Sequence, residues 1–189
     1  MKAKFLLILP LMLYMTIQVT SGQSTGNPLT DMILSAYSPR NYTTEAVTDQ
    51  QVDIILKCGI KAPSARNNQP WHFTVVKNEA LVKEIIPAAV AGNVLFVISG
   101  KESETGTTPD FDCGLTTENM FLGATALGLG ARIYGSPVAT AIKLREKLQI
   151  PAGFKPVIIL RTGNIEKTTD ASSGATPRKS SEEMVNIIK

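Results

Sequence analysis

The sequence predicts an α+β fold in which helices flank a central sheet, and two kinds of segment support this. Apolar residues recur at helical spacing over residues 52–60, whereas residues 94–98 form an unbroken apolar run that is typical of a buried strand. Segments of both kinds follow one another irregularly along the chain, without an internal repeat. This arrangement favours helices packed in layers on a sheet.

Capping residues mark where the first two helices begin. Asn27 followed by Pro28 is typical of a helix start, and this helix is predicted to run to about Tyr37. Thr48 and Gln51 form a capping box at the start of the second helix. Apolar residues at i, i+3, i+4, i+7 and i+8 spacing are expected to form its buried face: Val52, Ile55, Leu56, Gly59 and Ile60.

Three more helices are expected, over residues 78–86, over residues 111–127 and after Ser136. The second of these is rich in glycine and alanine, so another helix could approach it closely, either inside the core or across a dimer seam. Ser136 is predicted to cap the last helix, with Pro137 at its first position. Four residues are expected to form the buried stripe of that helix: Val138, Ala141, Ile142 and Leu148.

Strands are predicted where apolar residues alternate with polar ones or form short runs, over residues 71–77, 94–98, 132–134 and 157–160. Residues 101–109 are polar and contain a glycine, which is typical of a loop. Residues 163–181 are rich in Gly, Ser and Thr, as expected of a crossing arm or a loose tail.

Residues 62–72 form a loop of unusual composition between the second helix and the first strand. Pro63 and Pro70 exclude a helix and push the residue before each of them toward extended backbone, so the loop should be rigid. The hydroxyl and amide groups of Ser64, Asn67 and their neighbours suit the edge of a flat heterocycle. The same composition also fits a polar connection that only caps its neighbours.

Several motifs, in order, resemble the nitroreductase family of FMN-dependent oxidoreductases. They extend from about Ser38 to the C-terminus. The matching residues are Arg40-x-Tyr42, Ala62-Pro63-Ser64-x-x-Asn67-x-Gln69-Pro70-Trp71-x-Phe73, Asp112-x-Gly114, Met120-x-Leu122-x-Ala124-x-x-Leu127-Gly128-Leu129-Gly130, Pro151-x-Gly153-x-x-Pro156-Val157, Gly163 and Arg178-Lys179.

This resemblance implies both an architecture and a chemistry. The architecture is a mixed central sheet flanked by helices, in an intertwined homodimer with two FMN sites at the interface, each lined by both subunits. The chemistry is transfer of a hydride through the flavin to a small planar acceptor such as a nitroaromatic or a quinone. The resemblance makes NAD(P)H a candidate electron donor, but NAD(P)H is cytoplasmic, so the export signal at the N-terminus leaves the donor open.

The resemblance also implies which residues hold FMN. The positions that match phosphate ligands are Ser38, Arg40, Arg178 and Lys179, although Lys179 equally suits a solvated surface charge. Pro63, Ser64 and Asn67 match the residues around the flavin ring, and Gly135 or Ser136 would offer a backbone N–H to its central nitrogen. Arg66 is our own candidate for the positive charge beside the ring's pyrimidine edge.

One departure from the family pattern affects the phosphate end. Most relatives begin the first motif with Arg-Arg-Ser, whereas this chain has Ala36-Tyr37-Ser38. A charge-assisted hydrogen bond contributes about 1.5 to 3 kcal/mol, so the missing arginine is expected to weaken FMN binding by about 10- to 100-fold unless another cation replaces it.

Chemistry that is independent of a cofactor has few candidates. The single histidine, His72, lies in a predicted strand, which excludes a histidine metal cluster and leaves one candidate base for a catalytic triad. Gly128-x-Gly130 lacks the third glycine of a dinucleotide-binding fingerprint and is expected to form a helix C-terminus and a tight turn. We therefore expect no resident metal and a chemistry that comes from the cofactor.

The N-terminus resembles a signal peptide. Lys2 and Lys4 precede an apolar stretch over residues 5–19, and small residues at 20–22 suit a signal peptidase. We expect residues 1–22 to be removed and residues 23–189 to form one exported FMN-binding domain, periplasmic or secreted, with no stable membrane insertion. An uncleaved amphipathic anchor is the alternative.

The net charge and the two cysteines limit which partners and which redox chemistry are expected. Removal of Lys2 and Lys4 lowers the formal net charge from +3 to +1, and no basic run remains, so nucleic acid is not expected as a partner. Cys58 and Cys113 fall on predicted helices among apolar or small residues. The sequence leaves open whether they are buried thiols or a disulfide.

A second function is compatible with the same residues. An exported, non-catalytic protein could retain the fold to hold a flavin or another planar ligand. Ala36 and the leader favour this alternative, whereas the intact loop over residues 62–71 favours the enzyme.

Overall fold

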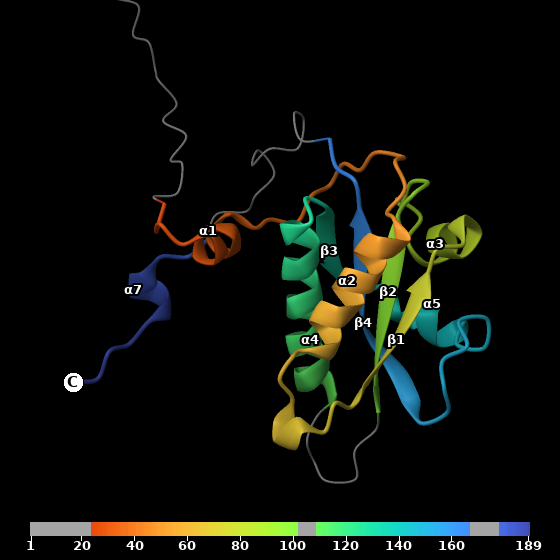
Figure 1. Cartoon of the computed structure of the whole chain (residues 1–189). Helices are drawn as coiled ribbons and strands as arrows, with labels where there is room; N and C mark the ends of the chain where they lie inside the picture. The colour runs from red at the N-terminus through yellow and green to blue at the C-terminus, as the bar shows by residue number, and fades with distance from the viewer. Residues whose placement is uncertain (1–23, 102–108, 167–177) are drawn as a thin grey trace, which may run out of the picture.

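A computed structural model describes residues 24–101, 109–166 and 178–189 of the chain. A four-stranded sheet lies between two layers of helices (Figure 1). Its strands have the order β1-β2-β4-β3 and these bounds: β1 Trp71–Val76, β2 Val94–Lys101, β3 Gly130–Tyr134 and β4 Phe154–Gly163. All three pairings among the described residues are antiparallel, so the parallel part of the expected mixed sheet is not seen in this part of the chain.

The helices occupy the two faces of the sheet and one flank of the molecule (Figure 1). The pair α2 (Asp49–Ile60) and α4 (Pro109–Ala126) covers one face, and the pair α3 (Glu79–Ile85) and α5 (Val138–Lys143) covers the other. The short helices α1 (Pro28–Ser35) and α7 (Ser181–Met184) stand beside this body.

Three of the predicted helix starts are confirmed; α4 begins at Pro109, two residues before the predicted Phe111, and the predicted cap of α5 is wrong. The side chain of Asn27 accepts hydrogen bonds from the amides of Leu29 and Thr30, and Thr48 and Gln51 make the expected capping box. The cap of α5 differs from the prediction, because this helix begins at Val138 after Pro137 and has no side-chain cap. Ser136 therefore lies free of the helix N-terminus, in the turn after β3.

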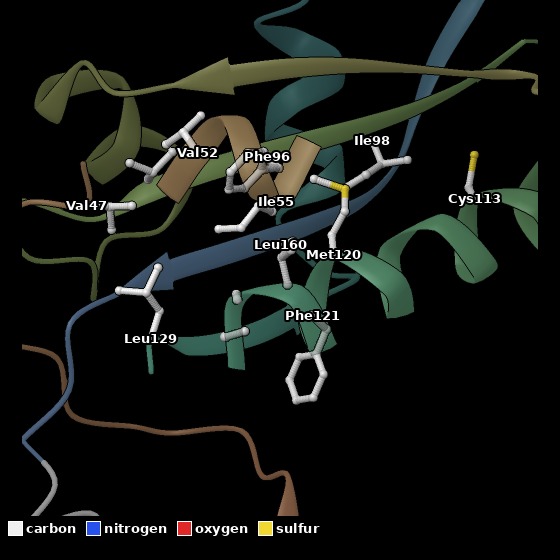
Figure 2. Close-up of a cluster of buried hydrophobic side chains, with 13 residues drawn as sticks. Val47, Val52, Ile55, Phe96, Ile98, Cys113, Met120, Phe121, Leu129 and Leu160 are labelled. Atoms are coloured by element: carbon white, nitrogen blue, oxygen red, sulfur yellow. The ribbon is translucent and has the colours of Figure 1, made fainter. Parts of the chain in front are cut away.

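The first hydrophobic core fills the space between the sheet and the pair α2 and α4. Figure 2 shows Ile55 and Met120 from these helices close to Phe96 and Leu160 from the sheet. Gly59 allows the close packing, because a Cβ at this position would lie 2.7 Å from Cγ of Met120. The second core lies on the other face and contains, among others, Val82, Leu95, Val97, Ala141 and Ile159.

Two residues expected in buried faces are exposed. Ile60 is 56% exposed and Ile142 is 49% exposed. Both lie near the end of a helix: Ile60 is the last residue of α2, and α5 ends one residue after Ile142. The helical spacing gives the correct face, but the partner layer does not reach these terminal positions.

The turn after α4 confirms the prediction for Gly128, whereas Gly130 is the first residue of β3 and not part of the turn. Gly128 has φ of +76° and its N–H donates to the carbonyl of Thr125, while the N–H of Leu129 reaches back to the carbonyl of Ala124. This is the pattern of a Schellman C-cap, in which glycine adopts the left-handed conformation.

Some predictions concern residues that the structure does not describe. The signal peptide and most of the loop over residues 101–109 lie outside the described ranges, as does much of residues 163–181. Within the described ranges, no helix is both long and apolar enough to cross a membrane.

Candidate active site

The loop before β1 has a strained and unusual backbone. It contains a single 3₁₀ turn, η1 (Ala65–Asn67), in which Arg66 has φ of 53° and Asn67 has φ of 57°. Gln69 has φ of 47°. Left-handed conformations are rare for residues with a side chain and tend to be found at binding sites and in turns that their surroundings hold in place.

Hydrogen bonds inside the loop stabilise this shape. The hydroxyl of Ser64 accepts from the amide of Gln69 at 2.9 Å, and the carbonyl of Ser64 accepts from the amide of Asn67 at 3.0 Å. Where the loop enters the sheet, the amide of Lys101 donates to the carbonyl of Pro70 at 2.7 Å. The Ser64 hydroxyl, which was predicted from the sequence to bind a ligand, thus accepts a hydrogen bond within the loop instead.

A side chain from α4 also binds the loop. The Oδ1 atom of Asp112 accepts from the amide of Ala65 at 2.9 Å, and Asp112 is buried. Sequence reasoning placed Asp112 in a family motif but gave it no role. The available clue was a carboxylate in the first turn of a helix, where the helix dipole favours negative charge.

The rest of this part of α4 fixes the end of α2. The hydroxyl of Thr116 donates to the carbonyl of Gly59 at 2.7 Å, and the amide of Asn119 donates to the carbonyl of Cys58 at 3.3 Å. These carbonyls belong to the last turn of α2, where the regular i to i+4 donors end, and the carbonyl of Gly59 also accepts from the amide of Ala62. The loop therefore begins from a fixed point.

The ring-binding candidates face outward from this anchored loop. Pro63, Arg66 and Asn67 are exposed, and Ser64 is half-buried. An exposed amide and guanidinium on a rigid backbone are available to a ligand with little ordering cost. The arrangement fits the edge of a flavin ring, as the resemblance implies.

The phosphate candidates meet at a second place. Ser38 and Arg178 line a hollow of about 220 Å³ between the segment after α1 and the outer side of α4. Ala36 lines the same hollow, where most relatives have an arginine, and Glu118 contributes a carboxylate. Arg40 and Lys179 are exposed. In the sequence, Arg40 is two residues from Ser38 and Lys179 directly follows Arg178, and both Ser38 and Arg178 line the hollow. The hydroxyl and guanidinium fit a phosphate, although Glu118 opposes one.

The segment that carries Ser38 and Arg40 is tied to the sheet. Pro39 is buried, and Tyr42 makes a β-bridge with Ile165. The guanidinium of Arg161, which is 3% exposed, lies over the Tyr42 ring. Ser38 and Arg40 are thus held at the end of the sheet where β4 ends.

The two groups of candidates lie at opposite ends of the sheet (Figure 1). Trp71, directly after the loop, pairs with Gly100, whereas Val94 pairs with Thr162 near the Tyr42 bridge. Along β2, the rise from Val94 to Gly100 is about 20 Å at roughly 3.3 Å per residue. The ribityl chain of FMN is shorter than this. One described chain therefore does not bring its ring and phosphate candidates into a single site.

Gly135 and Ser136 form a third group, in the turn between β3 and α5. Both are exposed, and a Cβ placed on Gly135 would meet no atom within 4 Å. Their backbone is open to a ligand, but the described residues place no other candidate beside it. The predicted role of this turn in contacting the flavin stays a prediction.

His72 lies in β1, as predicted, with its ring 5.6 Å from that of Phe154. Among the described residues there is no group of three or more His, Cys, Asp or Glu side chains that could hold a metal ion. Both cysteines are free. Burial raises the pKa of the Cys113 thiol to about 12, with the carboxylates of Asp110 and Asp112 adding to the effect.

Comparisons with known proteins identify the class to which this fold and these motifs belong. The model of the nitroreductase family matches residues 33–94. A protein of Archaeoglobus fulgidus, named as a proposed NADH dehydrogenase/NAD(P)H nitroreductase, is 35% identical over 143 residues, which cover 70% of this chain and 82% of the relative. The chain therefore belongs to the nitroreductase family.

Solved structures agree with this assignment. An FMN-dependent nitroreductase of Clostridium difficile has a TM-score of 0.66 and 26% identity, and the match covers 82% of this chain and 99% of that one. A nitroreductase with bound FMN from Bacteroides fragilis has a TM-score of 0.71 and 19% identity, covering 86% and 100%. The second similarity shows the fold alone, and this fold is the one that the resemblance implies.

Proposed function

We propose that the protein is an FMN-dependent oxidoreductase that passes electrons through the flavin to a small planar acceptor such as a nitroaromatic or a quinone. The observation that carries the proposal is the anchored loop over residues 62–70, which presents the exposed amide of Asn67 and guanidinium of Arg66 on a left-handed backbone. Membership of the family and the FMN-dependent relative support the choice of cofactor. Neither gives support to a non-catalytic role.

The residues divide the binding of FMN among them. Ser38 and Arg178, with Arg40 nearby, would hold the phosphate by charge-assisted hydrogen bonds. Asn67 and the backbone around Pro63 and Ser64 would orient the polar edge of the ring. When bound, the flavin supplies the hydride chemistry that no side chain of this protein offers.

Arg66 has a role of its own in this proposal. Its guanidinium is exposed and next to Asn67, so it can approach the pyrimidine edge of the ring. A positive charge at that place stabilises the negative charge that reduction brings there. The left-handed backbone of Arg66 sets the direction in which the side chain leaves the loop.

We further propose that the working unit is a homodimer in which each site takes its ring contacts from one chain and its phosphate contacts from the other. The separation of the two groups along the sheet supports this arrangement. Apolar residues on the flank of the molecule also need a cover. They include Leu29 and Leu34 of α1, at 62% and 69% exposed, and Ile187 and Ile188 near the C-terminus, at 79% and 96%.

The proposed location is outside the cytoplasm, on the basis of the leader over residues 1–22. NAD(P)H is a cytoplasmic donor, so an exported enzyme would need another source of electrons.

Reconstitution with FMN tests the proposal. The protein is incubated with excess FMN, free flavin is removed, and bound flavin is counted against subunits; sedimentation equilibrium at micromolar concentration gives the assembly. We expect most subunits to retain FMN and the dimer to predominate, because obligate dimers have no stable monomer. Retention by fewer than about one subunit in ten would contradict the cofactor assignment, and a folded monomer would contradict the shared site.

A further inference from the structure

Three polar residues of α4 form a stripe that faces the start of the binding loop. Asp112, Thr116 and Asn119 follow one another at i, i+4 and i+7, so they share one side of the helix. Thr116 and Asn119 donate to carbonyls in the last turn of α2. Asp112 reaches further along the chain, to the amide of Ala65. Thr116 and Asn119 therefore hold the C-terminal end of α2, and Asp112 holds the loop.

Asp112 is the one side chain from outside the loop that hydrogen-bonds to residues 62–70 within the described parts of the chain. It is 1% exposed, and a buried carboxylate is costly unless donors surround it. Its place in the first turn of α4 supplies such an environment. A buried carboxylate whose oxygen accepts from the binding loop points to a role in holding that loop.

The loop needs an external anchor because its own backbone is strained. Arg66, Asn67 and Gln69 all have positive φ, and such conformations persist only where the surroundings hold them. The remaining loop bonds, between Ser64 and its neighbours, close the turn on itself. They do not fix where the turn points. The Ala65 amide, at the first residue of η1, is where the anchor acts.

We propose that Asp112 is a positioning residue for the flavin: through the amide of Ala65 it holds the loop so that Asn67 and Arg66 face the ring. That the ligand is a flavin rests on the proposed function. The bond between Asp112 and the loop does not depend on it. Asp112 itself lies behind the loop and touches neither the flavin nor the acceptor.

Amide hydrogen exchange of the flavin-free, full-length protein tests the geometry. In Asp112→Ala, the amides of residues 62–70 should exchange about 10- to 100-fold faster than in the parent, because a hydrogen bond to a charged acceptor is lost. Asp112→Asn keeps an acceptor oxygen at the same place, so its loop should exchange within about 3-fold of the parent rate. An unchanged loop in Asp112→Ala, or a loop in Asp112→Asn as fast as in the alanine variant, overturns the inference.

Titration with FMN tests the consequence. The FMN dissociation constant should rise about 10-fold in Asp112→Ala and recover in Asp112→Asn. Thr116→Val is the matched control, because it removes a buried bond of the same stripe that holds α2 rather than the loop. It should lower the melting temperature while leaving the dissociation constant within about 2-fold. An equal loss of affinity in Thr116→Val would show a general structural effect and overturn the inference.

The test still gives a result if Asp112→Ala does not fold or if the parent binds no FMN. If Asp112→Ala does not fold, Asp112→Ser takes its place, since its shorter side chain fills the site with a hydroxyl that ends short of the Ala65 amide. If the parent itself binds no FMN, the proposed function fails, whereas the exchange experiment still decides whether Asp112 anchors the loop.

Discussion

The guanidinium carbon of Arg161 lies 3.9 Å from the centre of the Tyr42 ring, and its Nε donates to the side chain of Asn93 at 2.8 Å. This contact joins the end of β4 to the segment that carries Ser38 and Arg40. It gives the phosphate end of the proposed site a fixed base, as Asp112 does for the ring end.

Replacement of Arg161 should therefore destabilise the protein. In Arg161→Ala the buried Asn93 loses a donor and the Tyr42 ring loses its cation, so we expect the free energy of unfolding to fall by about 2 to 4 kcal/mol. Arg132 is a matched control: it is the direct partner of Arg161 in the sheet and lies 5.3 Å from the Tyr134 ring, but it is only half-buried. Arg132→Ala should cost less than about 1 kcal/mol. Urea denaturation of both variants decides the point, and equal losses would contradict it.

Arg40→Ala should weaken the binding of FMN without altering the chemistry. We expect the dissociation constant to rise about 10- to 100-fold because a charge-assisted phosphate contact is lost, with hydride transfer nearly normal at saturating flavin. Lys57→Ala serves as a control, since Lys57 pairs with Asp53 on the exposed side of α2. Fluorescence titration measures both constants. Parental affinity in Arg40→Ala would remove Arg40 from the site.

Asn67→Ala should act on the ring instead. The loss leaves a polar edge of the flavin unpaired, so the reduction potential should shift and reduction should be slower even at full occupancy. Asn68→Ala is the neighbouring control; Asn68 is equally exposed but has an ordinary right-handed backbone, with φ of −71°. Anaerobic stopped-flow reduction compares the two. Reduction of Asn67→Ala at the parental rate would show that this amide has no role at the ring.

Cys113 should make stability fall in alkaline solution. Burial raises the pKa of its thiol from the ordinary value of 9.0 to about 12. The folded protein therefore keeps a proton that the unfolded chain loses above about pH 9, so the stabilising effect is complete below pH 9 and disappears toward pH 12. Cys113→Ala should flatten this part of the stability profile. An equal fall of stability with pH in Cys113→Ala and the parent would show that the thiol is not protected by burial. In the folded parent, the half-buried Cys58 should react with an alkylating reagent before the buried Cys113.

The helices and strands could largely be predicted from the sequence, but the contacts between them could not. Capping residues such as Thr48 and Asn27 act over a few positions, and both helix starts follow from them. Ser136 failed as a cap because Pro137 takes the N-cap position, so α5 begins at Val138, one residue later than predicted. Ile60 and Ile142 have the right spacing but no neighbouring layer, and a periodic pattern contains no information about where that layer ends.

The candidate site shows the same limit. The loop over residues 62–70 could be found from its prolines and amides, because these act on the local backbone. The bond from Asp112 to Ala65 spans 47 positions in the chain, and the contact between Arg161 and Tyr42 spans more than twice as many. Long-range contacts of this kind depend on how strands and helices pack, so local patterns did not reveal either anchor.

The central claim is that one flavin site is completed by two chains, and a mixed dimer tests it most directly. Arg40→Ala and Asn67→Ala are co-expressed with different tags, and the heterodimer is purified, loaded with limiting FMN and reduced anaerobically with NADH. If each site takes Arg40 from one chain and Asn67 from the other, one site carries both changes and the second carries none. The account predicts that half of the sites bind FMN with parental affinity and reduce at the parental rate. A heterodimer in which one site binds FMN weakly and the other is reduced slowly, with no parental phase, would contradict it.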